Sequence, residues 1–524
     1  MRFFTAAGLL AFAAAASAAA QGPEDQRLTV QTASGTVEGV VENGLEAWLG
    51  LPYASPPTGP LRWRPPAPVK SWVGVRKAST LPGSCSQNGD LGVFAKAGGS
   101  EDCLYLNIYR PAGGVHDKLP VLVWIHGGAL LVGQGADYDP SKLATDGKSI
   151  VVTLNYRLGS FGFFAHPALA REGHPVGNYG LMDQQAALAW LQRNIAAFGG
   201  DPANVTIAGE SSGGNSVMAH IASPTAAGTF QNVVAMSGGA LMLRHPAFGA
   251  ALPIAEAEKA GLGLAKAAGC ERGGAKCLRS LSASQLLAVQ TPFSTRQVII
   301  DGTILPGHPG DIYRNGQVNK VNLISGSTRD EGRFFAALTE IATGKPMTAD
   351  TYPRELEAYY GAELAPRVAR EYPLDRYNNA SEAYSAAVTD SLFSCPGRAA
   401  QTALSARIPV YAYEFSDATA PSYAAPTTFP LLAAHTFEIP YVFLGFRGGG
   451  DAKVVLNPLQ AKLSDQMVGY FAAANRLGAP GTAWQAYRPE VENVMNFALP
   501  QGETVTGAFA KFHRCDFWAT TGIY

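Results

Sequence analysis

Short apolar runs alternate with helix-patterned segments through the first half of this chain, and that alternation restricts the possible folds more than any other feature. Residues 120–125 (PVLVWI) and 150–154 (IVVTL) are almost continuously apolar, which is typical of strands buried on both faces. Residues 182–198 instead repeat their apolar positions at helical spacing, and residues 205–208 (VTIA) form another short apolar run. Strands that alternate with helices predict an α/β fold with a central, mostly parallel sheet and helices on both faces.

The second half continues this pattern with longer helical insertions. Residues 323–324 and 409–415 are expected to be further strands, whereas residues 240–295 and 335–405 are rich in helix-patterned sequence. Ligands of such folds bind at one end of the parallel strands, and we expect the inserted helices to form a cap over that end. No composition break marks a linker, so residues 21–524 are predicted to form one domain.

The first 20 residues have the pattern of an export signal. Arg2 supplies positive charge, an alanine-rich apolar stretch follows, and residues 16–18 and 18–20 both fit a small-x-small cleavage site. A retained membrane anchor is the alternative, but alanine is a weak membrane residue and no basic flank follows. We therefore predict a signal peptide over residues 1–20 and a secreted or periplasmic mature protein that is not held in a membrane.

The charge balance argues against a nucleic-acid partner. Charged residues make up only 15% of the chain, the formal net charge is −1, and no run is rich in lysine or arginine. Proteins that bind nucleic acid or an anionic membrane surface usually carry a basic patch or stripe. The expected partner is therefore a small molecule.

Six cysteines are present, and an even count in an exported chain predicts disulfides. Fifteen pairings are possible, and the spacing does not choose between them. None of the cysteines has the CxxC spacing of zinc or thioredoxin-type sites. Scattered buried thiols are the alternative. The cysteines are Cys85, Cys103, Cys270, Cys277, Cys395 and Cys515.

The segment 209–213 (GESSG) contains a G-x-S-x-G motif between a short apolar run and a helix-patterned segment that follows Gly214. This is the context of a nucleophile elbow, in which the serine lies on a tight turn between strand and helix. The flanking glycines are needed because a Cβ would collide with the crossing backbone. Ser211 is therefore the predicted nucleophile, and an ordinary strand–turn–helix connection is the alternative.

A serine hydroxyl needs a base to take its proton, and in this kind of fold the partners follow in the order Ser, acid, His. His220 should point away along the helix that follows the elbow. Spacing alone does not separate the remaining candidates, nor does it single out one carboxylate as the acid. The histidines after Ser211 are His220, His245, His308, His435 and His513.

The segment 126–129 (HGGA) directly follows the apolar run 120–125. Two glycines after a buried strand allow bare backbone N–H groups to point into an open space, as stabilisation of a tetrahedral oxyanion requires. A plain turn is the alternative. Beside the G-x-S-x-G motif, the segment favours an oxyanion hole.

Together these motifs resemble those of the type-B carboxylesterases, a family of α/β-hydrolases that includes cholinesterases and bacterial carboxylesterases. The resemblance spans nearly the whole mature chain and is closest in character to the secreted bacterial carboxylesterases. It implies an α/β-hydrolase fold with a helical cap, and a catalytic domain over residues 21–524. The matching segments, in order, are 101–107 (EDCLYLN), 155–157 (NYR), 159–163, 177–181 (GNYGL), 183–184, 198–202 (FGGDP), 330–332 (DEG) and 435–441 (HTFEIPY).

The resemblance also implies roles for individual residues. His435 is the general base and acid, Glu331 is the acid that orients it, and neighbouring Asp330 is a bystander. Glu210, beside the nucleophile, is expected to tune the field of the site. The oxyanion donors are the backbone N–H groups of Gly128, Ala129 and Ser212, and Ser237 and Glu438 match polar positions buried behind the site. The implied disulfides are Cys85–Cys103, Cys270–Cys277 and Cys395–Cys515.

The chain departs from the family pattern at three places. The family often has glycine at the position of Ala129 and alanine at that of Ser212, but both positions act through a backbone N–H. Cholinesterases carry a tryptophan in the loop between the first two cysteines, which binds a quaternary ammonium by cation–π contact. Here the loop 86–102 has no tryptophan and Phe94 is its only aromatic residue, so acetylcholine is not the expected substrate.

The predicted function is that of a serine carboxylic ester hydrolase that works through an acyl-enzyme intermediate and needs no metal or organic cofactor. The substrates are expected to be small to medium esters. Because the segment 126–130 resembles the oxyanion loop of esterases that accept tertiary alcohols, bulky esters are included. An amidase or carbamate hydrolase with the same triad is one alternative, and a non-catalytic adhesion or binding module is another. Some relatives lose the serine, but Ser211, Glu331 and His435 are all present here.

Overall fold

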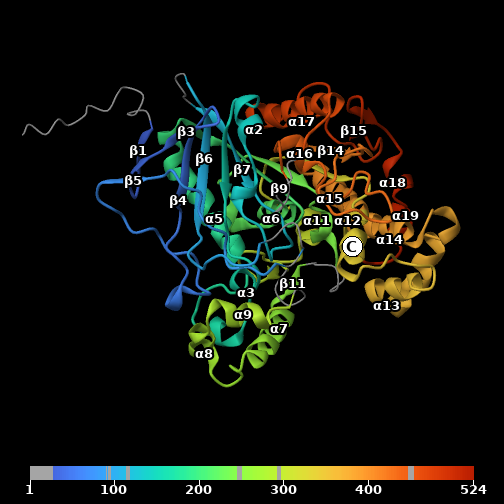
Figure 1. Ribbon diagram of the computed structural model, residues 1–524, viewed down its shortest axis with the longest axis horizontal. Helices are drawn as coiled ribbons and strands as arrows, with labels where there is room; N and C mark the ends of the chain where they lie inside the picture. Colours follow the sequence, from blue (N-terminus) through green and yellow to red (C-terminus); the bar gives the residue numbers. More distant parts are fainter. Residues whose placement is uncertain are drawn as a thin grey trace, which may run out of the picture.

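A mixed sheet of eleven strands forms the centre of the computed structural model (Figure 1). Its strands run in the order β16, β15, β14, β13, β10, β9, β7, β8, β6, β4, β3. The seven strands from β15 to β8 are parallel to one another, whereas those at both edges run antiparallel to their neighbours. The strands are β3 (Val40–Glu42), β4 (Leu45–Pro52), β6 (Tyr105–Pro111), β7 (Leu119–Ile125), β8 (Ile150–Leu154), β9 (Gly200–Glu210), β10 (Asn232–Met236), β13 (Asn322–Thr328), β14 (Val410–Phe415), β15 (Val494–Phe497) and β16 (Glu503–Val505).

The structure describes residues 28–89, 91, 96–113, 118–244, 251–291, 297–446 and 454–524. The predicted signal peptide over residues 1–20 lies outside this range, as do Phe94 and His245. None of the helices within the described ranges has the length and apolar character needed to cross a bilayer.

The strand β7 is apolar throughout because both of its faces are buried. Val121, Val123 and Ile125 belong to the core layer that includes residues of α5 (Tyr179–Asn194) and α6 (Ser212–Ala222). Leu122 and Trp124 point the other way, into a second layer that contains residues of α17 (Pro458–Leu477). Because successive side chains alternate between faces, a strand covered on both sides has no position left for a polar residue. The predicted α/β fold is confirmed.

The predicted helix over residues 182–198 is α5, which begins three residues earlier and continues into a 3₁₀ turn, Ile195–Phe198. The helix expected after Gly214 is α6, but it already begins at Ser212. Glycine is a poor helix former, so the pair Gly213–Gly214 suggested a later start. Both glycines lie inside the helix, where the space requires them. A Cβ at Gly213 would lie 2.1 Å from the carbonyl oxygen of Ile125, and one at Gly214 would lie 2.4 Å from that of Met236.

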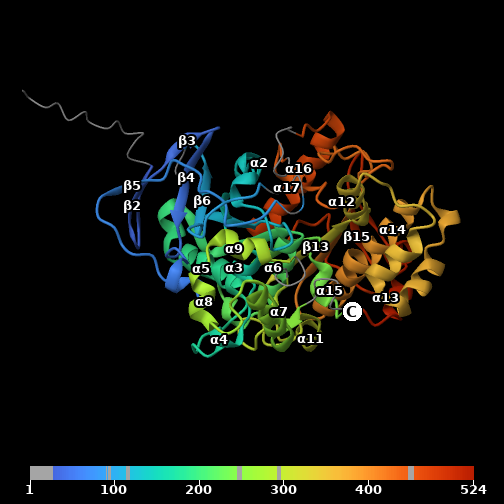
Figure 2. The same ribbon diagram turned by 60° about the horizontal axis from the view of Figure 1, so that its bottom comes forward.

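The two helix-rich insertions form separate groups. The first comprises α7 (Ile254–Ala267), α8 (Gly274–Ser280) and α9 (Ala283–Val289), which lie together at the bottom of Figure 1. The second comprises α12 (Gly332–Thr343), α13 (Tyr352–Glu371), α14 (Ala380–Val388), the π-helical turn Thr389–Ser394 and α15 (Cys395–Ser405). Its members α13 and α14 lie at the right in both Figures 1 and 2.

Smaller elements complete the fold. Strands β1 (Thr29–Thr32), β2 (Gly35–Glu38) and β5 (Val75–Lys77) make a three-stranded sheet, and β11 (Leu252–Pro253) pairs with β12 (Ile299–Ile300). The short helices are α2 (Ser141–Thr145), α3 (Gly159–Gly162), α4 (Pro167–Ala170), α11 (Pro309–Asn315), α16 (Ile439–Val442), α18 (Phe509–Phe512) and α19 (Cys515–Ala519).

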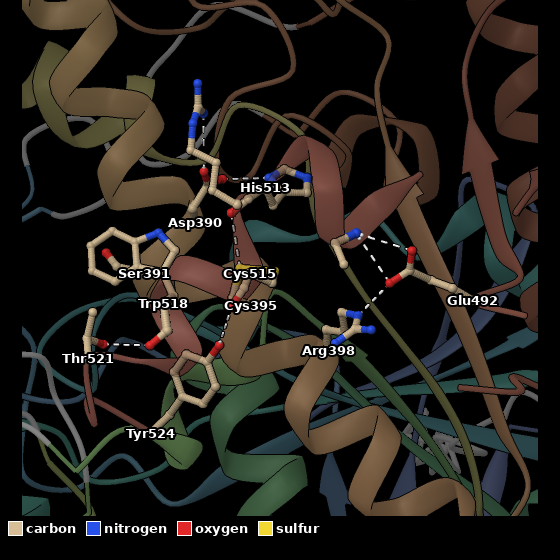
Figure 3. The surroundings of a disulfide bond; sticks show 12 residues. Asp390, Ser391, Cys395, Arg398, Glu492, His513, Cys515, Trp518, Thr521 and Tyr524 are labelled. Carbon is tan, nitrogen blue, oxygen red and sulfur yellow. Dashed lines mark hydrogen bonds and ion pairs between the residues drawn. A yellow bond between two sulfur atoms is a disulfide. The ribbon is translucent and has the colours of Figure 1, made fainter. Parts of the chain in front are cut away.

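All six cysteines are paired. The disulfides are Cys85–Cys103, Cys270–Cys277 and Cys395–Cys515, the pairs that the family resemblance implies. The third joins the start of α15 to the start of α19 across a sequence separation of 120 residues (Figure 3). It therefore ties the C-terminal segment to the second helical group.

Candidate active site

Ser211 lies between the end of β9 and the start of α6, with backbone angles of φ 57° and ψ −121°. A non-glycine residue at positive φ is strained, and such strain gathers at functional sites. The flanking glycines permit the turn, because a Cβ at Gly209 would lie 2.5 Å from the carbonyl carbon of Gly213. The strand–turn–helix context expected for the G-x-S-x-G motif is present.

Glu331 follows β13 and is fully buried. One of its carboxylate oxygens, Oε1, accepts a hydrogen bond of 2.6 Å from the Ser237 hydroxyl and one of 2.8 Å from the Thr328 N–H. The other, Oε2, contacts Nδ1 of His435. The carboxylate is thus held in place on one side and directed at the imidazole on the other.

The second imidazole nitrogen of His435, Nε2, approaches the residue that precedes Ser211. This nitrogen lies 3.3 Å from Oε1 of Glu210. Within the described ranges the Ser211 hydroxyl makes no hydrogen bond to the protein, so Nε2 faces Glu210 rather than Ser211 in this state. Bonds between nucleophile and base are often loose in unliganded enzymes and tighten with substrate. The three predicted triad residues therefore converge on one buried site.

Aromatic rings enclose the imidazole of His435. The ring centres of Phe393, Phe335 and Phe334 lie 4.8, 5.2 and 5.8 Å from that of His435. These residues come from the π-helical turn and from α12, which belong to the second helical insertion. Their sequence pattern does not distinguish them from ordinary core residues, so no motif predicts their place beside His435.

The predicted oxyanion loop follows β7 in an unusual conformation. Gly128, Ala129 and Leu130 have φ values of 100°, 57° and 60°. A Cβ at Gly128 would lie 2.2 Å from the carbonyl oxygen of Val132, so this position requires glycine. The N–H groups of Gly128 and Ala129 donate to no protein acceptor in the described part of the chain, which leaves them free for a ligand oxygen.

Ser212 supplies the third predicted donor from the first turn of α6, where backbone N–H groups have no partner within the helix. Its side chain has a second task, because its hydroxyl accepts a 3.1 Å hydrogen bond from the Leu130 N–H. The serine found where the family often has alanine thus ties the elbow to the oxyanion loop.

His126 supports this loop from behind. Its ring stacks on Tyr156 with 4.4 Å between ring centres, and the Tyr156 hydroxyl donates to its carbonyl oxygen over 2.8 Å. Burial lowers the pKa of His126 to about 4, although its contact with the Gly127 carbonyl acts in the opposite direction. His126 therefore stays neutral at physiological pH and acts as an anchor.

Two more buried carboxyls lie close enough to Glu331 to interact with its charge. Burial, with the charges of Glu438 and Glu331, raises the pKa of Glu210 well above its usual range. Burial and the Glu331 charge likewise raise the pKa of Glu438. Both groups favour their protonated forms, which leaves Glu331 as the carboxylate that contacts His435.

The other histidine candidates lie elsewhere. His220 is buried against Gln184, and burial lowers its pKa to about 3. His308 caps the N-terminus of α11, and His513 is held between two carboxylates away from Ser211. Asp330 contacts Arg333 at 3.5 Å and the backbone of Ala433 instead of the imidazole.

Comparison with known proteins agrees with this geometry. The model of the carboxylesterase family matches residues 26–518. Para-nitrobenzyl esterase of Bacillus subtilis is 35% identical over 487 residues, covering 89% of this chain and 94% of the relative. Human cocaine esterase is 34% identical over 503 residues, covering 91% and 87%. A solved structure of a thermophilic pNB esterase superposes with a TM-score of 0.78 at 33% identity, covering 93% of this chain and 99% of that one.

Proposed function

This chain belongs to the carboxylesterase family and is a carboxylic ester hydrolase, and we propose that it acts through a triad of Ser211, His435 and Glu331. The observation that carries the proposal is the contact of Glu331 with Nδ1 of His435. The 3.3 Å approach of Nε2 to Glu210, next to Ser211, adds support. Nucleophile, base and orienting acid are the parts that a serine hydrolase requires.

In the proposed first half-reaction, Ser211 attacks the ester carbonyl while Nε2 of His435 takes its proton. The N–H groups of Gly128, Ala129 and Ser212 stabilise the oxyanion of the tetrahedral intermediate. His435 then protonates the leaving alcohol, and the acyl group stays on Ser211.

In the second half-reaction, His435 takes a proton from water, and the resulting hydroxide attacks the acyl carbonyl. Collapse of the tetrahedral intermediate releases the carboxylic acid, and the proton returns to Ser211. Glu331 orients the imidazole throughout and stabilises its charged form. Glu210, 3.3 Å from Nε2, tunes the field around that charge.

The first test is covalent labelling. An organophosphate should add once, on Ser211, as measured by intact mass and peptide mapping. Ser211→Ala and His435→Ala should each lower kcat by about a million-fold, as loss of a triad member does. His308→Gln is the matched control, since His308 caps α11 away from the site, and it should retain its activity. Labelling of another serine, or near-normal activity of His435→Ala, would contradict the triad.

The same site could favour amides or carbamates, because the triad chemistry is identical. Matched ester and anilide substrates with one acyl group separate these functions. We expect the ester to be cleaved far faster, since an amine leaves less readily than an alcohol. A faster anilide reaction would identify an amidase.

For substrate range, we propose that bulky alcohol groups are accepted. Gly128, Ala129 and Leu130 have positive φ values, the N–H groups of Gly128 and Ala129 donate to no acceptor in the described ranges, and a methyl at Ala129 adds little bulk. Relatives named for cocaine and fumonisin B1 fit a family with large substrates. Tert-butyl acetate should be hydrolysed alongside n-butyl acetate. If the tertiary ester stays at the level of Ser211→Ala while the linear one is cleaved, the proposal is wrong.

We also propose that residues 1–20 are removed during export and that residues 21–524 form the mature enzyme. The three disulfides support an oxidising compartment. The N-terminus of protein isolated from medium or periplasm should begin close to residue 21. An intact Met1 on active, exported protein would contradict this.

A further inference from the structure

A cavity of about 450 Å³ lies beside the second helical group and the C-terminal segment. This volume is within the range of small-molecule sites. No member of the triad and no oxyanion donor lines it. Its lining includes four arginines: Arg329, Arg333, Arg376 and Arg514.

The wall of the cavity touches both sides of the triad acid. Asp330 directly precedes Glu331 and lines the cavity. Thr389, another lining residue, accepts a 2.9 Å hydrogen bond from the N–H of Gly332, the residue after Glu331. A ligand in this cavity would therefore contact Asp330 and Thr389, which are linked directly to Glu331 itself or to its neighbour Gly332.

Among the residues that line this cavity, positively charged side chains outnumber carboxyls. Four arginines line it, against the three carboxyls of Asp330, Glu382 and Asp390. His513 adds a fifth cation. Burial alone would lower its pKa, but the carboxylates of Asp390 and Glu414 outweigh burial and raise the pKa to about 9. Figure 3 shows the His513–Asp390 contact, which measures 2.6 Å.

Several of these cations keep donors available. Arg376 is exposed, and its side chain forms no ion pair or hydrogen bond within the described ranges. The ion pairs of Arg514 are long, 3.5 Å to Glu371 and 3.9 Å to Asp390, and its guanidinium lies over the Tyr372 ring, 4.6 Å from the ring centre. Arg329 binds Glu414 through Nε and Nη2, which leaves Nη1 free of that pair. The remaining arginine, Arg333, is occupied by Asp330, by Glu382 and by a backbone carbonyl.

We propose that this cavity binds a small oxyanion with two or three negative charges, a polycarboxylate or a phosphate, and that its occupation shifts the position of Glu331. Guanidinium groups match the geometry of carboxylate and phosphate oxygens in paired hydrogen bonds. Two negative charges on a ligand would balance the excess of five cations over three carboxyls among the lining residues. Binding of the anion does not depend on the proposed function, whereas its effect on catalysis rests on the proposed role of Glu331.

Binding is tested on the full-length mature protein by thermal unfolding with citrate or phosphate, each compared with sodium chloride at equal ionic strength. We expect a saturable rise in Tm with at least one of the two anions, and the anion with the lower half-saturation concentration identifies the source. In Arg376→Gln the apparent Kd should be about three- to tenfold higher, because one partly screened charged contact is lost. The control Arg370→Gln removes the same charge from an exposed position of α13 that does not line the cavity.

Absence of a saturable shift with both anions would overturn the site. So would an equal Kd in Arg376→Gln and wild type, or an equal loss in Arg370→Gln. Coupling is tested by measuring kcat on a saturating ester at increasing anion concentration. The change in kcat should be half complete at the same anion concentration as the rise in Tm. A constant kcat with a clear Tm shift would overturn the coupling. The binding readout needs no activity, so a failure of the triad in the labelling experiment is distinguishable from a failure of this site.

Discussion

Raising the pH from 7 to 9 should destabilise this protein through one buried histidine. The His513 side chain is 1% exposed, and its two nitrogens lie 2.6 Å from Asp390 Oδ1 and 2.7 Å from Glu414 Oε1. Burial opposes its charge, but the two carboxylates prevail and raise its pKa from 6.5 to about 9. The folded protein therefore holds this proton more tightly than the unfolded chain does.

The size and sign of the effect follow from linkage. A gap of that size corresponds to about 3 kcal/mol of folding free energy. Because the folded pKa is the higher one, this stabilisation is fully present below the unfolded value of 6.5 and is lost as the pH rises through about 9. Between pH 7 and pH 9 the expected loss is about 2 kcal/mol.

The assay is urea unfolding followed by tryptophan fluorescence at pH 7 and pH 9, for wild type and for His513→Gln. Glutamine keeps a donor but has no charge to lose. Between pH 7 and pH 9 the unfolding free energy of His513→Gln should therefore fall by about 2 kcal/mol less than that of wild type. The two proteins should differ most at pH 7 and approach each other at pH 9. Parallel pH dependence of the two proteins would refute a charged His513 between the carboxylates.

Three further outcomes are expected. Gly213→Ala should cost about 3 kcal/mol of stability in urea unfolding, since its Cβ would lie 2.1 Å from a carbonyl oxygen of β7; wild-type stability would contradict the packing. Ser237→Ala removes the 2.6 Å hydrogen bond to Glu331 and should lower kcat about tenfold with little change in KM, whereas a change in KM alone would argue against a positioning role. Serine at both positions of Cys395–Cys515 opens a separation of 120 residues and should cost about 5 kcal/mol in the chain-entropy model, measured by urea unfolding; a loss below 1 kcal/mol would exclude that model here.

Local patterns were sufficient for the elements that position the site. The strands β7 and β8 and the helix α5 could be predicted because burial on two faces, or on one stripe, leaves a periodic signature in the chain. The elbow could be predicted because a positive φ at Ser211 and the tight crossing at Gly209 impose residue types within a few positions. The start of α6 was misplaced by three residues because the packing of Gly213 against β7 outweighs its low helix propensity.

The choice of base could not be derived from spacing. Glu331 and His435 are 104 residues apart, and His245, His308 and His513 had an equivalent claim until the family resemblance singled out His435. Contacts such as Phe393 against His435, or the 3.3 Å approach of Nε2 to Glu210, depend on how the second helical insertion packs. No period in the chain encodes that packing.

By itself, the sequence determined the α/β class, the tight turn at Ser211 and the glycine loop after β7, because each arises from backbone geometry within a few residues. Only the tertiary structure decided which donors hold Glu331, which histidine lies between Asp390 and Glu414, and that a cation-rich cavity adjoins the loop that carries Glu331. The physical reason is that parallel strands bring the ends of β9 and β13 close together in space although they are far apart in sequence. Burial then assigns each charged group its partner, because an unpaired charge in the interior is too costly to keep.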